Sequence, residues 1–329
     1  MSGAASAVAT GGGIVMAVWR PMMRVGKVAL VVLLATASMP RFVHARFDPL
    51  DPLGQVPKKH VELSIEVAPG EWGGVDVGDI ELVLGSVAAV FLEHVKLVRD
   101  DLKLRVIPRG GSPRVLYERG GDGQYVIQLT ARDQRWFQYA YQFAHELCHV
   151  VSNFDHRVVG DKAVADNQWF EESLCETAAL FTLKRLGVVW ANNPPKRDWM
   201  GYGDSFASYA AFLLREPHRH LEADLSLRDW YAENAVSLRD DPYQRRKNEV
   251  VANKLLPLFE QAPEHWRSIA YLNPDAASAS KPFAEYLSDW HRACPDKTLP
   301  RLVMLRFGFE PGAGEAAPQA ALPSTPLRR

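Results

Sequence analysis

The sequence predicts an α+β fold in which a small mixed sheet comes first and a mainly helical region follows. Between residues 61 and 129, short segments alternate apolar and polar side chains, which is typical of half-buried strands. From residue 136 onward, apolar residues recur at steps of three and four, which is typical of amphipathic helices. The 329 residues can bury a sizeable core, and the formal net charge of −1 argues against nucleic acid as a main partner.

The expected sheet is built from four short segments. A helix at residues 77–95 separates the first strand from the other three. Glycines within residues 120–123 predict a turn between the last two strands. The expected strands are residues 61–67, 102–107, 114–118 and 125–129.

A longer helix is expected directly after the last strand. Thr130 and Asp133 have the spacing of a capping box, which places the start of this helix near residue 130. A neighbouring, largely apolar stripe carries His145 and His149, so we expect these histidines to be partly buried. The stripe that should face the core consists of Trp136, Ala140, Phe143, Leu147 and Val150.

His145, Glu146 and His149 form an HExxH motif on this helix. Residues four positions apart lie on one helix face, so both imidazoles can bind the same metal ion. A buried pair of histidines needs a partner, and zinc is the simplest one. Glu146 is turned to the flank of the site, where it can act as a general base without binding the metal. The motif therefore predicts one zinc ion per chain and a hydrolytic reaction.

A second helix offers the third protein ligand that a catalytic zinc usually takes. It is expected to begin at residue 166 or 167 and to end at Gly187. Glu172 and Glu176 share one face of it, and carboxylates on an otherwise apolar helix need a cation or a donor. We expect Glu172 to bind the metal and Glu171 to lie on a solvated edge. Further helices are expected at 206–214, 225–235, 245–261, 263–271 and 283–293.

HExxH followed by a glutamate on a second helix resembles the pattern of gluzincin metallopeptidases, the class of thermolysin and aminopeptidase N. Residues 169–173, Trp-Phe-Glu-Glu-Ser, are similar to the W-L-N-E-G segment of the aminopeptidase branch. The resemblance implies a zincin-like fold with His145, His149 and Glu172 on zinc, and with Glu176 hydrogen-bonded to a zinc-bound histidine. It also implies a peptide or protein substrate, bound at the edge of the strand that precedes the zinc helix.

Gluzincins also use a tyrosine or histidine from the C-terminal subdomain to stabilise the oxyanion. Tyr243 is the favoured candidate, because it lies on a polar stretch before an expected helix. The other candidates are Tyr231, His218 and His220.

Three alternatives stay open at this point. Asp155 lies six residues after His149, where metzincin-like enzymes place a third ligand, although Ser152 stands where those enzymes need glycine for a sharp turn. The reaction is also open, because zinc and a glutamate would equally serve hydrolysis of a non-peptide amide or ester. Zinc could instead stabilise a non-catalytic binding protein.

The three cysteines are Cys148, Cys175 and Cys294. Cys148 and Cys175 lie on the two helices that carry the candidate ligands, so they could bridge those helices or one could bind metal. We favour packed core residues for both.

A secretory signal peptide is expected at residues 1–45. Basic residues precede an apolar run at 28–37, residues 43–45 offer a cleavage site, and residues 1–13 form a Gly- and Ala-rich extension. We therefore expect a periplasmic or secreted protein, or one anchored in the membrane by this segment if it stays uncleaved. The rest is expected to comprise an N-terminal subdomain (46–152), a mainly helical subdomain with the third ligand (153–309) and a disordered tail (310–329).

Overall fold

A five-stranded mixed sheet organises the N-terminal part of the protein. The computed structural model describes residues 43–45, 62–95 and 101–310. In the strand order β1-β2-β3-β5-β4, the three central strands are parallel, and each edge strand is antiparallel to its neighbour. The four predicted strands are confirmed to within one residue, as is the α+β class. The strands are β1 (Val43–Ala45), β2 (Glu62–Val67), β3 (Asp101–Pro108), β4 (Arg114–Arg119) and β5 (Tyr125–Leu129).

The unpredicted strand β1 coincides with the segment at which signal cleavage is expected. It pairs antiparallel with β2, with Val43 opposite Ile65 and Ala45 opposite Leu63. Cleavage after Ala45 would remove this strand and make β2 the edge of the sheet. The rest of the expected signal segment and residues 311–329 lie outside the described residues.

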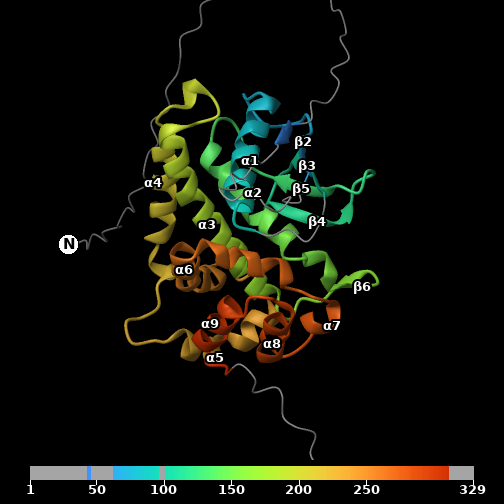
Figure 1. The fold of residues 1–329 in the computed structure, drawn as a ribbon, viewed down its shortest axis with the longest axis vertical. Coiled ribbons are helices and arrows are strands. Elements are labelled where there is room, and N and C mark those ends of the chain that lie inside the picture. The colour runs from blue at the N-terminus through green and yellow to red at the C-terminus, as the bar shows by residue number, and fades with distance from the viewer. Residues whose placement is uncertain (1–42, 46–61, 96–100, 311–329) are drawn as a thin grey trace, which may run out of the picture. The chain divides into compact units, whose positions relative to one another are not determined.

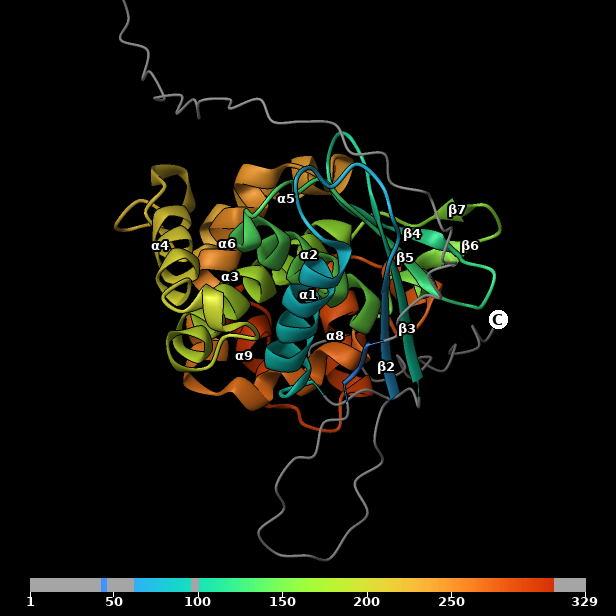
Figure 2. The ribbon, with the colours of Figure 1, turned by 90° about the horizontal axis from the view of Figure 1, so that it is seen from above.

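Two helices cover one face of the sheet, as Figure 2 shows: α1 (Val77–Leu92) and α2 (Trp136–Val151). Alternation along the strands explains this arrangement, because one side of each strand is apolar and buried. In β3 these side chains are Leu102, Leu104 and Val106, and in β5 they are Tyr125, Ile127 and Leu129. The opposite side of β3, with Asp101, Lys103 and Arg105, is exposed.

The C-terminal part is helical and is built around α3 (Gln168–Asn192), which packs against α2, α4 and α6 (Figure 1). A short hairpin, β6 (Val158–Val159) and β7 (Lys162–Ala163), precedes α3. The later helices are α4 (Gly203–Leu214), α5 (Leu227–Asp240), α6 (Arg245–Gln261), α7 (Ala276–Ala279), α8 (Phe283–Ala293) and α9 (Thr298–Arg306). Among the described residues, no helix is long and apolar enough to cross a membrane.

The start of α2 differs from the prediction. The helix begins at Trp136, and neither Thr130 nor Asp133 caps it. Asp133 instead adopts a left-handed φ of 55° and accepts a hydrogen bond from the amide of Gly74. Thr130 pairs with Gln142, nearly two turns into the helix. These contacts fasten the loop before α2 to the helix itself and to the loop that carries Gly74, so the capping-box prediction is wrong.

The end of α3 also differs. Gly187 does not terminate the helix, which continues to Asn192. It lies where α3 meets α4, and a Cβ on Gly187 would be 3.1 Å from the Cβ of Ala207. A Cβ on Gly203, at the start of α4, would be 2.7 Å from the carbonyl oxygen of Gly187. The two glycines therefore allow a close helix contact.

The strand at the edge of the sheet is β4 rather than β5. The sequence placed the strand before the zinc helix at this edge, but β5 is paired on both sides, by β3 and by β4. The turn at residues 120–123 folds β4 back outside β5. The side of β4 away from β5 has no strand partner among the described residues.

Candidate metal centre

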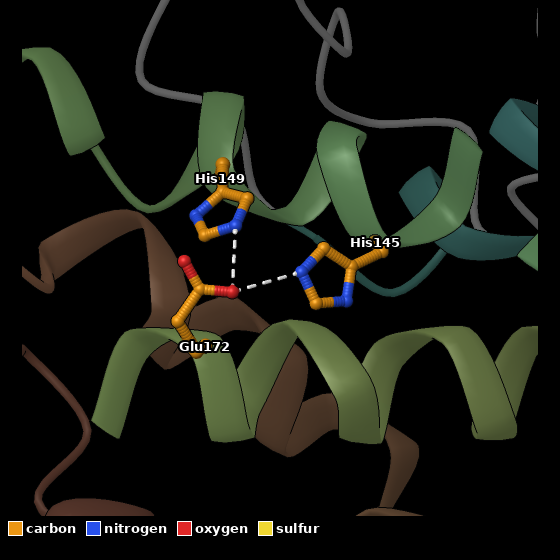
Figure 3. Close-up of side chains that lie close together, drawn as sticks. All are labelled: His145, His149 and Glu172. Atoms are coloured by element: carbon orange, nitrogen blue, oxygen red, sulfur yellow. Dashed lines mark hydrogen bonds and ion pairs between the residues drawn. The ribbon is translucent and has the colours of Figure 1, made fainter. Parts of the chain in front are cut away.

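Helices α2 and α3 bring His145, His149 and Glu172 together (Figure 3). The Glu172 Oε2 atom lies 3.2 Å from His145 Nε2 and 3.6 Å from His149 Nε2. Donors bound to one tetrahedral zinc at about 2.0–2.1 Å stand roughly 3.3 Å apart. The spacing and the chemistry of these three donors therefore fit one zinc ion, with a fourth position left for another ligand.

The ring of His149 is held by Glu171. His149 Nδ1 lies 2.6 Å from Glu171 Oε1. The other carboxylate oxygen accepts from Asn273 Nδ2 (2.6 Å) and forms an ion pair with Arg157, whose Nε lies 3.0 Å away. Such a contact fixes which ring nitrogen faces a metal. The sequence placed Glu171 on a solvated edge, but its side chain is fully buried. This prediction is wrong because the partners that make burial favourable are distant in sequence.

Glu176 was expected to hydrogen-bond a zinc-binding histidine. Its Oε2 atom lies 4.0 Å from His145 Nδ1, too far for a hydrogen bond. It instead accepts from the hydroxyl of Tyr141, and its Oε1 accepts from Arg219 NH1 at 2.8 Å. In this arrangement Glu176 contributes negative charge near His145, and Glu171 makes the direct contact to a histidine ring.

Glu146 lies beside the donor group and is buried, with 3% of its surface exposed. Burial raises the pKa of its carboxyl, while nearby His145 and His149 partly oppose this increase. The backbone amide of Val115, on edge strand β4, is close enough to this carboxyl to lower its pKa in part. Glu146 therefore connects the histidine pair to the edge of the sheet, and its raised pKa suits a group that accepts a proton and later releases it.

The charges of the donor group depend on one another. Burial opposes the charge on His149, but attraction by Glu172 and the hydrogen bond to Glu171 raise its pKa well above the usual value. Burial likewise opposes ionisation of Glu172, yet His149 and His145 hold its pKa well below the usual range. Without a metal, His149 thus tends to hold a proton, and a cation bound there would take its place.

A cavity of about 680 Å³ opens onto these residues. One wall is edge strand β4 with the loop before it, residues 109–117, and another is α2. Tyr243, Arg245 and Glu249 contribute from the helical part of the protein. The donor group therefore borders a space large enough for several residues of a ligand.

Of the four candidates for the oxyanion donor, Tyr243 lines the cavity. Its hydroxyl accepts from Gln168 Nε2 at 2.8 Å, and the same amide group lies 3.3 Å from Glu172 Oε1. Tyr231 stacks on Trp169 within an aromatic cluster. His218 binds Glu249, and His220 binds the carbonyl of Leu214. None of these three lines the cavity.

The alternative ligand Asp155 is directed elsewhere. Its Oδ2 atom accepts from Arg119 NH2 at 2.6 Å and lies 3.4 Å from the hydroxyl of Tyr125. Among the described residues, it is not part of a group of donors close enough to share a metal. The geometry therefore favours Glu172 over Asp155.

A second group of metal-binding residue types consists of Glu216, His218 and Glu249, of which Glu249 lines the cavity. Arg219 contacts both carboxylates, at 3.0 Å to Glu216 and 2.8 Å to Glu249. Arg245 also donates to Glu249, at 2.8 Å. His218 is hydrogen-bonded directly to Glu249, which leaves no room for an ion between them. The guanidinium groups of Arg219 and Arg245 therefore already serve as the cations of this group.

Cys148 and Cys175 face each other between α2 and α3 as free, fully buried thiols. Burial, followed by a hydrogen bond to Cys148, raises the pKa of Cys175 well above its usual value. A protonated thiol is a poor metal ligand. Cys294 is also a free, buried thiol. Packing as small core residues accounts for all three.

Comparison with known proteins identifies no relative of this chain. No protein-family model matches the chain, and a search of curated proteins finds no significant match. The functional proposal therefore rests on the geometry of the site and on the resemblance of its motifs.

Proposed function

We propose that this protein is a zinc-dependent metallopeptidase of the gluzincin type. The observation that carries the proposal is the placement of a buried carboxylate, Glu146, beside a three-donor group whose spacing fits zinc. A purely structural metal site has no use for such a base. Both features border one cavity with an unpaired strand edge.

His145, His149 and Glu172 would hold the metal, one ion per chain, and Glu171 would orient His149. When bound, zinc would supply Lewis acidity that polarises the scissile carbonyl and lowers the pKa of water. The donor set of two imidazoles and one carboxylate is one that catalytic zinc sites use.

Glu146 would take a proton from the attacking water and pass it to the leaving amine. Its raised pKa supports this double role, because a strongly acidic carboxyl would hold the proton too weakly to deliver it. Tyr243 would donate a hydrogen bond to the oxyanion from the opposite wall of the cavity. The bond from Gln168 leaves the proton of the Tyr243 hydroxyl available for donation.

The free edge of β4 favours a peptide over another amide or an ester. An extended peptide can pair its backbone with this edge, as an added strand does. Val115 on β4 contacts Glu146, so a peptide on this edge would pass the general base. A small amide or ester has no backbone to exploit such an edge.

The Glu146→Gln variant tests the proposal against an unbiased peptide library. Glutamine keeps the shape but cannot accept the proton, so hydrolysis should fall by about 10²–10⁴-fold. Zinc content and melting temperature should stay near those of the unsubstituted protein, because no donor to the metal changes. Equal hydrolysis by both proteins would refute Glu146 as the base. Cleavage of ester or non-peptide amide probes alone would favour the other hydrolase class, and zinc binding without any hydrolysis would favour a binding protein.

A further inference from the structure

The charges that line the cavity fall into two groups. Around the metal centre, positive and negative groups are matched: Arg245 pairs with Glu249, and Arg157 with Glu171. At the other end, Arg109 and Arg114 have no carboxylate within ion-pair distance among the described residues, and neither contacts a metal donor. The cavity therefore ends in an uncompensated positive charge.

Arg109 and Arg114 are brought together by one amide oxygen. Arg114 Nε donates to Gln128 Oε1 at 2.7 Å, and Arg109 NH1 donates to the same atom at 3.2 Å. A neutral oxygen shared by two guanidinium groups does not cancel their charge. Both side chains retain unused N–H donors, since each guanidinium carries five. Two guanidinium groups fixed side by side match the two oxygens of a carboxylate.

The pair lies where a bound peptide would pass. Arg114 directly precedes Val115, the residue whose amide contacts Glu146, and it stands opposite Gln128 in the antiparallel register of β4 and β5. Side chains alternate between the faces of a sheet, so alternate residues of a peptide on β4 would neighbour Arg114. At about 3.3 Å per residue, such a neighbour lies within a few residues of the bond beside Glu146.

We propose that Arg109 and Arg114 form a carboxylate-binding subsite that selects peptide substrates with a negative charge close to the cleaved bond. This inference rests on the proposed peptidase function and gives it a substrate class. The carboxylate can come from an aspartate or glutamate side chain or from a free C-terminus, because both present the same two oxygens.

Three matched peptides test the proposal and separate the two sources. One is neutral with an amidated C-terminus, one carries a single internal glutamate and is amidated, and one is neutral with a free C-terminus. The glutamate is placed in turn at each position within three residues of the cleaved bond. We expect at least one charged peptide to exceed the neutral one about tenfold in kcat/KM, since a charged hydrogen bond contributes roughly that factor. The preference should shrink as salt is raised.

Substitution of the arginines should abolish this preference. In the double variant Arg109→Gln, Arg114→Gln, the ratio between charged and neutral peptides should fall to about one. Arg114→Glu should reverse the preference toward peptides with lysine at the same position. Arg105→Gln is the matched control, because Arg105 is exposed on the same face of the sheet but does not line the cavity. Its ratio should equal that of the unsubstituted protein.

A binding measurement separates failure of this inference from failure of the proposed function. Glu146→Gln protein loaded with zinc should bind the preferred charged peptide about tenfold more tightly than the neutral one, and adding the two arginine substitutions should remove the difference. Hydrolysis without any preference for charge would overturn the subsite and leave the peptidase intact. Arginine-dependent binding without hydrolysis would support the subsite and refute the peptidase. Equal binding of all three peptides would overturn the subsite.

Discussion

The protein contains two groups of histidine and glutamate side chains that one network of contacts links. The two groups differ in what surrounds them. His145, His149 and Glu172 stand 3.2 and 3.6 Å apart at their nearest donor atoms. Glu216, His218 and Glu249 are drawn together by Arg219, whose guanidinium contacts both carboxylates. Under the proposed function the first group would take a cation from outside, while the second already contains one in Arg219.

The difference teaches that residue types alone do not identify a metal site. A zinc ion needs donors separated by about the length of a tetrahedral edge and free of another cation. Glu176 joins the two groups, because it lies near His145 and also accepts from Arg219. Arg219, which binds the second group, therefore also holds the carboxylate of Glu176 near His145.

The largest expected effect is on zinc content, which should distinguish the two groups. Glu172→Ala removes one of three donors and should leave the protein without zinc after dialysis. Glu249→Ala is the matched control in the second group and should retain one zinc per chain. Metal analysis of both variants decides the assignment. Full retention by Glu172→Ala together with loss in Asp155→Ala would instead point to the metzincin-like ligand set.

Arg219→Met should disrupt the second group, which should lower the stability of the protein rather than its metal content. Arg219 is fully buried, and its loss takes the arginine partner from the buried carboxylate of Glu176 and leaves Glu249 with Arg245 alone. Removing one member of a buried ion pair costs about 3–5 kcal/mol in the free energy of unfolding. Chemical denaturation measures this change. Lys103→Gln, at an exposed ion pair with Asp101, should cost about 1 kcal/mol or less, and an equal loss in both variants would contradict the comparison.

Zinc itself should stabilise the protein through the first group only. A ligand present at about 100 times its dissociation constant raises the free energy of unfolding by about 2.7 kcal/mol. Thermal unfolding with and without added zinc, after removal of metal by a chelator, measures this gain. Glu249→Ala should keep it and Glu172→Ala should lose it. A gain that survives Glu172→Ala would place the bound zinc elsewhere.

The smallest effect concerns the two glutamates beside the histidines. Glu171→Gln should weaken zinc binding by about 10–100-fold, as loss of a carboxylate partner of a metal-binding histidine does. Glu176→Gln should weaken it less, because Glu176 lies 4.0 Å from His145 and makes no hydrogen bond to it. Competition with a coloured zinc chelator gives both affinities. The reverse order would restore Glu176 as the histidine's main partner.

The sequence predicted the parts of this site that depend on local spacing. The strands at 114–119 and 125–129 follow from alternation, and the histidine pair follows from helical periodicity. The role of Glu171 could not be predicted, because Asn273, one of the partners that stabilise it, is 102 residues away.

The ends of helices show the same limit of prediction from local sequence, as Gly187 and Asp133 illustrate. Glycine often ends a helix, but here it permits close contact with α4, which only the tertiary arrangement reveals. Asp133 has the sequence signature of a cap, yet its carboxylate binds the amide of Gly74 on a loop 59 residues earlier. The same residue types serve both purposes, so local patterns cannot distinguish them.

The contact between Asn273 and Glu171 has a consequence for the order of events during synthesis. The side-chain amide of Asn273 donates to Glu171 and to the carbonyl of Ser152 just after α2, and its Oδ1 accepts from the hydroxyl of Tyr286. When α2 has left the ribosome, Asn273 has not yet been translated. A nascent or truncated chain that ends before Asn273 would carry the whole HExxH motif without the contact that Asn273 makes to Glu171, so the proposed activity should depend on synthesis past this residue.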